Sequence, residues 1–577
     1  MRTDGRVFRR ARIAVLFAAV AALLGACSIE EDEGSIAEPA NNQSPHLAEA
    51  TYSAGLKENR IVYDKDKPDS LVNLYITLTE DNKTAEKPMS WAELNRITYT
   101  QPEGNPEMSV ILQEGDENGP KPGMFGYGEP YPNGKITLRG KSTLRASQKS
   151  YKIKLLDNAG RWNDQETINL IKHSFDFSRI RNRLSFDYFK QIPNFTSLRT
   201  QFVHLYVKDL SGSGTSDKFE DYGLYEQIEQ PNKSFLRTHG LDPYGQLYKA
   251  SSFEFFRYPE QLKLATDPDY DKAAFESVLE IKGSNDHAKL LEMLDALNDN
   301  SRDIDDVLDR YFDRDNFMTW MAVNILMDNM DTHAQNFMLY SPMNSNKWYF
   351  LPWDYDGAWG YYEQWPDRPS SRREWMVGLQ NYWGSVLQKK VFKNPKNVEA
   401  LTAKIEELSK IVNADQSRQM IEGYRTVVEP FIRSMPDIQY LGGPVSGYEA
   451  ELERIIELPE VNKKKYLDSL QKPMAFFLGD PKKTNDGYAF NWDISYDLQG
   501  DELHYTFELA KNPLFSNPIV KLNGLSEPTV TVNKPLKGHY FWRVRVTDSR
   551  GNEMSAFDQY VDEDDTEYNG VRDFYTQ

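Results

Sequence analysis

Cysteine, positive charge and long apolar runs are all scarce in this sequence, and each scarcity excludes something. One cysteine among 577 residues can form neither an internal disulfide nor a cysteine-based zinc site, so the fold depends on packing and hydrogen bonds. Lys and Arg number 68 against 87 Asp and Glu, a net charge of −19. Nucleic acid is therefore not expected as a partner, because its phosphate backbone is bound by clustered basic residues. After residue 24 there is no run of about 18 apolar residues, so we expect no further segment to span a membrane.

The chain nevertheless contains enough apolar material for a large folded core. Hydrophobic residues make up 39% of it and aromatic residues 13%, too much for a disordered protein. Its length is about four times the ~150-residue size typical of a domain, so we expect a large domain with an appendage.

The N-terminus has the pattern of a bacterial lipoprotein signal peptide. A basic segment precedes an apolar run from Ile13 to Leu24, which is too short to span a bilayer comfortably. The string Leu24-Gly25-Ala26-Cys27 resembles the lipobox, whose cysteine is lipidated and becomes the mature N-terminus. We expect a signal peptide at 1–26 and an acidic, polar tether at 27–48, anchored through Cys27 at the extracytoplasmic face of a bacterial membrane. The alternative is that Cys27 is an ordinary residue of a secretory leader.

Hydrophobic periodicity divides the rest of the chain into an α+β part at 49–480 and an all-β part at 481–577. One stretch, Asn316 to Met327, is apolar nearly all round, which predicts a buried helix. The other predicted segments are strands within 51–150, a helix at 168–188, strands at 202–207 and 223–228, helices within 288–327, and helices at 398–411 and 417–432.

The C-terminal part alternates apolar and polar residues, so that half of each predicted strand faces a core, as in a sandwich. The strings Tyr505–Leu509 and Tyr540–Val546, closed by the turn Asp548 to Asn552, resemble a fibronectin type III module. That resemblance implies a small β-sandwich, which usually spaces or binds and rarely catalyses.

Four polar side chains flank a predicted β-hairpin that follows the apolar helix. Strands at 337–340 and 347–353 are separated by a turn rich in Ser, Pro and Asn, and their pairing sets Tyr340 opposite Lys347 and Phe337 opposite Phe350. Cross-strand neighbours lie about 5 Å apart and diagonal ones about 7 to 8 Å. At the mouth of the hairpin we therefore expect four side chains to converge: Asp331, Asn336, Asp354 and Asp356.

These oxygen donors suit a hard divalent cation such as Mg²⁺ or Mn²⁺. Crowded carboxylates would cost desolvation and repulsion unless a cation offset them. The alternative is a solvated acidic cluster, since Asp-x-Asp recurs at 64/66, 267/269 and 303/305. A glycosidase acid/base pair at Asp354 and Asp356 is disfavoured, because residues two apart on a strand project side by side from one face.

The spacing from Asp331 to Asn336 matches the catalytic Asp and the metal-binding Asn of protein kinases. Asp354, placed after a strand, matches the aspartate that holds Mg²⁺ in those enzymes.

A kinase also needs cations for the nucleotide phosphates. The predicted strand at 150–155 places Lys152 and Lys154 on one face, and the loop before it contributes Arg139. The alternative for the lysines is a solvated face of an edge strand.

Four groups of residues, in order along the chain, resemble the CotH kinase family, also called spore coat protein H. The resemblance spans 138–360 and implies an atypical protein-kinase-like fold that transfers the γ-phosphoryl of ATP to Ser or Thr of surface or spore-coat proteins. The groups are Arg139–Thr143 with Lys149–Leu155, Gly223–Gln230 with Phe235-Leu236, Asp331–Asn336, and Trp353–Asp356.

The resemblance implies a role for each acidic residue of the hairpin. Asp331 would orient and deprotonate the substrate hydroxyl. Asn336 and Asp354 would hold Mg²⁺ or Mn²⁺, and Asp356 is a candidate second ligand.

It also implies an ATP-binding set. Arg139 and Lys154 would contact phosphates, with Lys152 the rival of Lys154, and Glu229 would be the acidic partner that positions the lysine. In this family the loop often has Asn-Ser where this chain has Lys141-Ser142.

Two functions remain open. One is a membrane-tethered protein kinase; the other is a surface binding or assembly protein that keeps the fold without turnover, because a lipoprotein lies outside the cytoplasmic ATP pool. Cleavage before Cys27 removes five arginines and one aspartate, leaving 63 basic and 86 acidic residues and a charge of −23. Such a charge favours a basic protein substrate.

Overall fold

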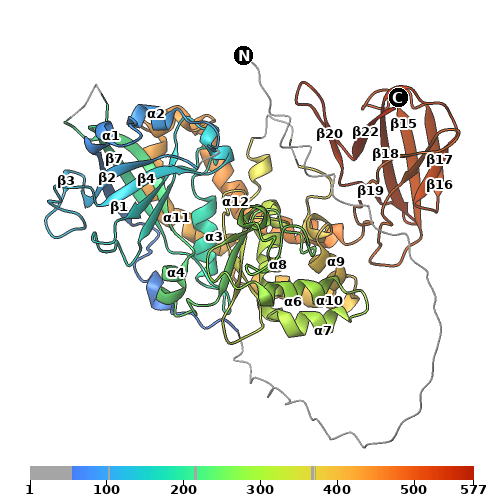
Figure 1. Ribbon diagram of the computed structural model, residues 1–577, viewed down its shortest axis with the longest axis horizontal. Helices are drawn as coiled ribbons and strands as arrows, with labels where there is room; N and C mark the ends of the chain where they lie inside the picture. Colours follow the sequence, from blue (N-terminus) through green and yellow to red (C-terminus); the bar gives the residue numbers. More distant parts are fainter. Residues whose placement is uncertain (1–54, 102–103, 213–216, 366–369, 371, 577) are drawn as a thin grey trace, which may run out of the picture. The chain divides into compact units, whose positions relative to one another are not determined.

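The computed structural model describes residues 55–101, 104–212, 217–365, 370 and 372–576 (Figure 1). The predicted signal peptide, the tether and Cys27 lie outside these residues. Among the helices that are described, none combines the length and the apolarity needed to cross a membrane. The fold is mixed α+β, with a closed, barrel-like sheet near the N-terminal side and an all-β region at the C-terminal end.

The first sheet closes on itself because β1 pairs with β2 as well as with β7. Its order is β1-β7-β8-β6-β5-β4-β2-β3, and the β1–β7 pair is parallel. Alternating apolar residues such as Leu74, Val110 and Ile153 fill its interior. The strands are β1 (Leu71–Leu78), β2 (Glu107–Asp116), β3 (Gly119–Pro120), β4 (Gly134–Arg139), β5 (Ser150–Leu155), β6 (Thr167–Ile171), β7 (Thr200–Asp209) and β8 (Glu220–Glu229).

Period-two alternation gives this sheet an inner and an outer set of side chains. Tyr151 and Ile153 on β5 point inward. Lys152 and Lys154, which alternate with them along the strand, therefore point outward. Lys152 pairs with Thr137 of β4 and Asn169 of β6, which places these neighbours on the same outer face.

Helices and a second sheet form the larger core. This sheet has the order β10-β9-β11-β12. Its strands are β9 (Gln246–Ala250), β10 (Leu279–Ile281), β11 (Phe337–Ser341) and β12 (Tyr349–Pro352). The helices of the chain are α1 (Asp81–Thr84), α2 (Trp91–Asn95), α3 (Arg181–Phe189), α4 (Lys233–Thr238), α5 (Lys272–Val278), α6 (Ala288–Asn298), α7 (Ile304–Tyr311), α8 (Arg314–Leu326), α9 (Val386–Phe392), α10 (Pro395–Leu408), α11 (Ala414–Ile432) and α12 (Tyr448–Ser469).

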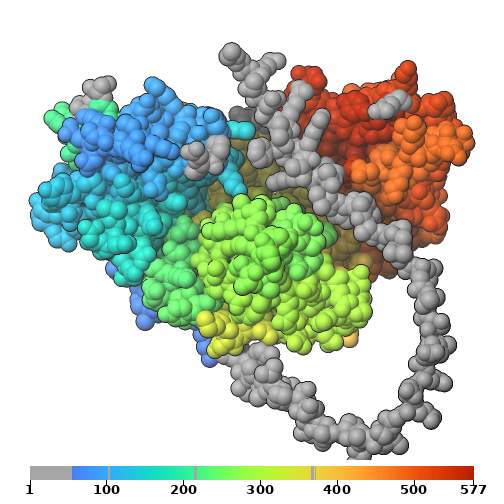
Figure 2. Space-filling view, viewed as in Figure 1, coloured from blue at the N-terminus to red at the C-terminus, as the bar shows by residue number. Residues whose placement is uncertain are grey.

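Helix α8 is the buried helix that the sequence predicts. Every residue from Asn316 to Leu326 is buried, and the Asp313 side chain caps the helix by accepting the Asn316 backbone N–H at 2.9 Å. By contrast, α6 and α7 form part of the molecular surface in yellow-green (Figure 2). The end of α8 therefore leads from the core directly to the predicted hairpin.

Three sequence predictions need correction. The hairpin register is shifted by two residues, with Phe337 opposite Pro352 and Tyr340 opposite Tyr349. An even shift keeps every side chain on its predicted face. Residues 167–171 form strand β6 rather than the start of a helix, and the helix begins only at Arg181. The alternation of apolar residues in 168–171 could not be told apart from a helical period over so short a stretch. Helix α12 was missed.

The C-terminal region is all β, as predicted. Phe507, Trp542 and Val544 are fully buried in its core. Its longest strands are β15 (Leu503–Ala510) and β18 (Gly538–Asp548), which pair antiparallel. The others are β13 (Lys482–Lys483), β14 (Tyr488–Asn491), β16 (Val520–Leu525), β17 (Thr529–Val532), β19 (Glu553–Ser555), β20 (Gln559–Val561), β21 (Glu567–Asn569) and β22 (Val571–Thr576).

Candidate active site

The segments before and after the β11–β12 hairpin have an unusual backbone. Asp328, Asn336 and Asp354 have φ of 55°, 60° and 63°, and His173 beside them has φ of 51°. A left-handed conformation costs a non-glycine residue roughly 1–2 kcal/mol, less for Asp and Asn. Such strain collects where a chain must aim its side chains, so this hairpin is a candidate functional site.

Asp331 lies in a short 3-10 turn, Met330–Thr332, between α8 and β11. Asn336 Nδ2 donates to its Oδ2 at 2.8 Å, and Gln335 Nε2 donates to its Oδ1 at 2.7 Å. Burial raises the pKa of Asp331 and the neighbouring Asp354 adds to the rise, while these amide hydrogen bonds oppose it. The structure therefore brings Asp331 and Asn336 into direct contact.

Asp354 and Asp356 follow β12 and complete the acidic cluster. Burial, and then the charge of Asp354, raise the pKa of Asp356 to about 7, and Asp331 adds to this rise. The three carboxylates therefore lie within electrostatic range of one another. The Asp356 side chain is still 37% exposed, so a ligand can reach it from solvent.

A buried polar group supports this segment from behind. His173 Nε2 lies 2.6 Å from Glu226 Oε2, and its Nδ1 lies 3.9 Å from Asp356 Oδ2. Asn182 of α3 donates from Nδ2 to Glu226 Oε1 at 2.9 Å and accepts the Tyr355 backbone N–H at 3.0 Å. The side chain of Asn182 thus joins strand β8 to the loop that carries Asp354 and Asp356.

Arg139, at the end of β4, provides positive charge beside the cluster. Its guanidinium lies 5.3 Å from the centre of the Trp353 ring. Burial lowers its pKa, whereas Asp354, Asp356 and Glu226 act in the opposite direction. Arg139 is therefore close to all three acids.

Lys152 and Lys154 differ in their surroundings. Lys152 is partly buried, and its pKa is lowered by burial and then by other cations, including Arg139. Lys154 is exposed. Of the two lysines, Lys152 lies nearer to Arg139 in the register of β4 and β5.

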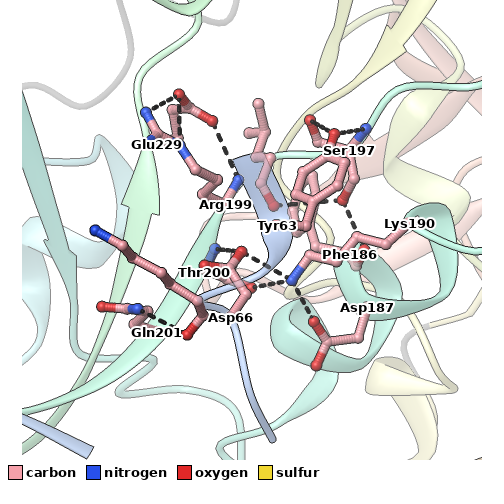
Figure 3. A network of polar contacts seen from close by, with 12 residues as sticks. Tyr63, Asp66, Phe186, Asp187, Lys190, Ser197, Arg199, Thr200, Gln201 and Glu229 are labelled. Carbon is pink, nitrogen blue, oxygen red and sulfur yellow. Dashed lines mark hydrogen bonds and ion pairs between the residues drawn. The ribbon is translucent and has the colours of Figure 1, made fainter. Parts of the chain in front are cut away.

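The expected pairing of Glu229 with a lysine is not found. Glu229 accepts hydrogen bonds from Arg199 Nε at 3.0 Å and from the Arg199 backbone at 3.2 Å (Figure 3). It also lies 2.8 Å from His239 Nε2. Burial would raise the pKa of Glu229, but His239 and Arg199 outweigh it and lower the pKa to about 2. This carboxylate belongs to a buried ion-pair network away from the acidic cluster.

The reason is the alternation of faces in the closed sheet. Glu229 pairs with Ile168, which points inward. Glu226 pairs with Ile171 and lies on the outer face, which it shares with Arg139 and Lys152. The acid missed by sequence reasoning is thus Glu226, three residues earlier in the same string. Knowledge of the strand pairing would have identified it.

These two glutamates give a matched pair of variants. We expect Glu226→Gln to lower the activity of this site about tenfold, because Arg139 loses a nearby opposite charge. Glu229→Gln should leave the activity within about twofold in the folded protein but lower the free energy of unfolding by about 3 kcal/mol, since it leaves buried cations unpaired. Activity and urea unfolding measured on both variants test this, and a larger activity loss in Glu229→Gln would contradict it.

The donor chemistry of the acidic cluster suits a divalent cation. Asp331, Asn336, Asp354 and Asp356 offer carboxylate and amide oxygens, the donors that Mg²⁺ and Mn²⁺ prefer. Burial first, and then the charges of Asp354 and Asp331, raise the pKa of Asp356. A cation bound there would favour the ionised form of this carboxyl.

The closed sheet, the β11–β12 hairpin and the acidic cluster together define a mixed α+β protein in which cationic side chains lie beside a group of carboxylates. Comparison with known proteins identifies the family. The family model described as CotH kinase protein matches residues 136–465, more than half of the chain, and the chain belongs to this family. Membership of a kinase family suggests phosphotransferase chemistry for this chain.

A curated relative agrees with this assignment. The chain is 24% identical over 228 residues to inner spore coat protein H of Bacillus subtilis (strain 168), an alignment that covers 39% of this chain and 58% of the relative. This chain therefore spans less than two thirds of the relative's length, and the similarity is that of a distant homologue.

Proposed function

We propose that the chain is an atypical protein kinase of the CotH type, which uses ATP and Mg²⁺ or Mn²⁺ to phosphorylate Ser or Thr of surface or spore-coat proteins. The observation that carries the proposal is the contact between Asn336 and Asp331, with Asp354, Asp356 and Arg139 close enough to change one another's pKa values, inside the region that matches the family. Phosphoryl transfer needs mainly positioning and neutralisation of charge, and this set of residues can supply both.

Asp331 is the residue that would receive the proton of the attacking hydroxyl. Its carboxylate is held in place by the amides of Gln335 and Asn336. The raised pKa of Asp331 makes it a better proton acceptor than an ordinary aspartate, because acceptor strength rises with pKa. The two amide hydrogen bonds also fix the orientation of the Asp331 carboxylate.

Asn336 and Asp354 would hold the metal ion, with Asp356 as a further ligand. A bound Mg²⁺ or Mn²⁺ would neutralise phosphate charge. Arg139 and Lys152 would bind the phosphates from the outer face of the sheet, with Lys154 more distant from the cluster. Glu226, which contacts His173 and Asn182, would be the acidic partner of these cations, the role first expected of Glu229 toward the lysine.

We further propose that the protein is lipidated at Cys27 and acts outside the cytoplasmic membrane on a basic substrate. The charge of −23 without residues 1–26 supports a basic partner through electrostatic complementarity. The competing function is a binding or assembly protein without turnover, which the distance of this compartment from cytoplasmic ATP favours.

The direct test uses the chain from residue 28 onward with labelled ATP, Mg²⁺ or Mn²⁺, and a Ser-rich basic protein. We expect transfer by the parent, and a loss of about 10² to 10⁴-fold in Asp331→Asn, because a general base contributes about that much. The nucleotide-induced rise in melting temperature should persist in Asp331→Asn, since Asp331 faces the hydroxyl and not the nucleotide. A parent that neither transfers label nor shifts its melting temperature with ATP would leave the binding protein as the better assignment.

A further inference from the structure

Two turns of the C-terminal region bring three aspartates together. Asp497 and Asp501 lie in the turn before β15, and Asp548 lies at the end of β18. One oxygen from each carboxylate lies within 4.8 Å of those of the other two. The turns are about fifty residues apart in sequence, so only folding creates this cluster.

One oxygen each of Asp497 and Asp548 stabilises its own turn by accepting backbone hydrogen bonds. Asp497 Oδ1 accepts the backbone N–H groups of Gln499 at 2.8 Å and Asp501 at 3.0 Å. Asp548 Oδ1 accepts those of Arg550 at 2.9 Å and Asn552 at 2.8 Å. These bonds hold the carboxylates rigidly in their turns, but they occupy only one oxygen of Asp497.

The second oxygen of Asp497, Oδ2, does not stabilise the turn in this way. The residue is 6% exposed, and its Oδ2 is buried without a hydrogen-bond partner in the part of the chain that the structure describes. Asp501 Oδ2 is likewise buried and accepts no hydrogen bond there, although Arg550 Nε lies 2.8 Å away. A buried carboxylate oxygen without a partner costs roughly 1–3 kcal/mol or more, so the Asp497 Oδ2 atom indicates a missing ligand.

The net charge of the three aspartates and their basic neighbour also favours a cation. Three carboxylates face one guanidinium, that of Arg550, which is 52% exposed. Two negative charges remain, the amount that one divalent cation neutralises.

We propose that Asp497, Asp501 and Asp548 form a Ca²⁺ site that is separate from the kinase-like site. Ca²⁺ binds oxygens at about 2.3–2.6 Å, so two ligands on opposite sides of the ion are about 4.8 Å apart. Mg²⁺, with bonds of about 2.0–2.1 Å, requires a tighter set. Water would complete the coordination, and the exposed Arg550 side chain would turn out to solvent.

Binding there would stiffen the connection to α12. Gln499 Nε2 donates to the Leu470 carbonyl at 3.0 Å, and Asn552 Nδ2 donates to the Gln471 carbonyl at 3.0 Å. Both donors come from the two turns that carry the aspartates. Ca²⁺ would therefore fix the turns that contact the chain just after α12.

Calorimetric titration of the chain from residue 28 onward with CaCl₂ tests the site. In Asp354→Asn, which weakens the kinase-like site, we expect one Ca²⁺ to bind still. Asp501→Asn should weaken this event at least tenfold. Arg550→Gln should tighten it, because it removes the cation that competes for Asp501.

The gain in Arg550→Gln cannot arise from misfolding, so it keeps the test decisive if Asp501→Asn unfolds. Thermal melting of each variant in EDTA checks the fold. Ca²⁺ affinity that neither Asp501→Asn nor Arg550→Gln changes would overturn the proposal. Absence of Ca²⁺ binding in Asp354→Asn would do the same, and tighter binding of Mg²⁺ than of Ca²⁺ would overturn the choice of ion.

Discussion

Asp354→Asn is expected to lower the rate of phosphoryl transfer by about 10³-fold while leaving the protein folded. Removal of one preorganised charged group from a reaction site costs about two to three orders of magnitude, and Asp354 is proposed to hold the metal as well. Asn is the right substitution because φ at this position is 63°, a conformation that Asn tolerates and Ala does not. The measurement is transfer of label from ATP to the substrate protein.

The stability of this variant should be equal to that of the parent or higher. The Asp354 carboxylate repels those of Asp331 and Asp356 and raises their pKa values. A neutral amide at position 354 removes this repulsion. Asp64→Asn is a matched control, since Asp64 begins another Asp-x-Asp and is exposed. Retention of more than about a tenth of parental activity in Asp354→Asn would argue against its proposed role.

The second large effect is a pH dependence of stability caused by His239. Its Nε2 lies 2.8 Å from Glu229 and its Nδ1 lies 2.7 Å from Glu58, and the side chain is fully buried. Burial alone would lower the pKa of His239, but Glu229 and then Glu58 raise it to about 9 from the ordinary 6.5. Folded protein therefore keeps a proton that unfolded protein loses between these two pH values.

The sign follows from this difference in bound protons. Below pH 6.5 the stabilisation is fully present, and it declines as pH rises to about 9. The shift corresponds to a loss of about 3 kcal/mol in the free energy of unfolding across that window. Urea unfolding of the parent and of His239→Gln at pH 6 and at pH 9.5 measures it as the difference between the two proteins, since Lys172 and Lys289, whose pKa values burial lowers to about 8, act in the opposite direction in both.

His239→Gln should remove most of this pH dependence and should be less stable than the parent at pH 6 by about 3 kcal/mol, because two buried carboxylates lose their shared cation. His504→Gln is the control, since His504 lies at the protein surface in the C-terminal region and is 43% exposed. If the slope between pH 6.5 and 9 survived in His239→Gln, another group would have to be responsible.

Local patterns in the sequence were sufficient for several features. The buried helix α8, the hairpin after it and the alternation of β15 and β18 depend on residues close together in the chain, whose spacing defines which face is apolar. The two-residue error in the hairpin register did no harm, because Asn336 and Asp354 flank the paired segments in either register. The position of these residues on either side of the hairpin was therefore predictable.

Pairings between distant strands were not predictable in the same way. Whether Glu226 or Glu229 faces Arg139 depends on the register of β4, β5, β6 and β8, because a shift of one residue reverses the face of every side chain. Asn182 reaches the site because α3 lies beside the loop after β12, and His173 reaches it from the end of β6.

The sequence by itself therefore determined the family and the hairpin that carries Asp331, Asn336, Asp354 and Asp356, since both are written in short-range order. Tertiary structure alone decided that Glu226, and not Glu229, shares a face of the sheet with Arg139, and it alone assembled Asp497, Asp501 and Asp548. The physical reason is that spacing along the chain sets which residues share a face of one element, whereas closure of a sheet and the meeting of two turns set which faces meet.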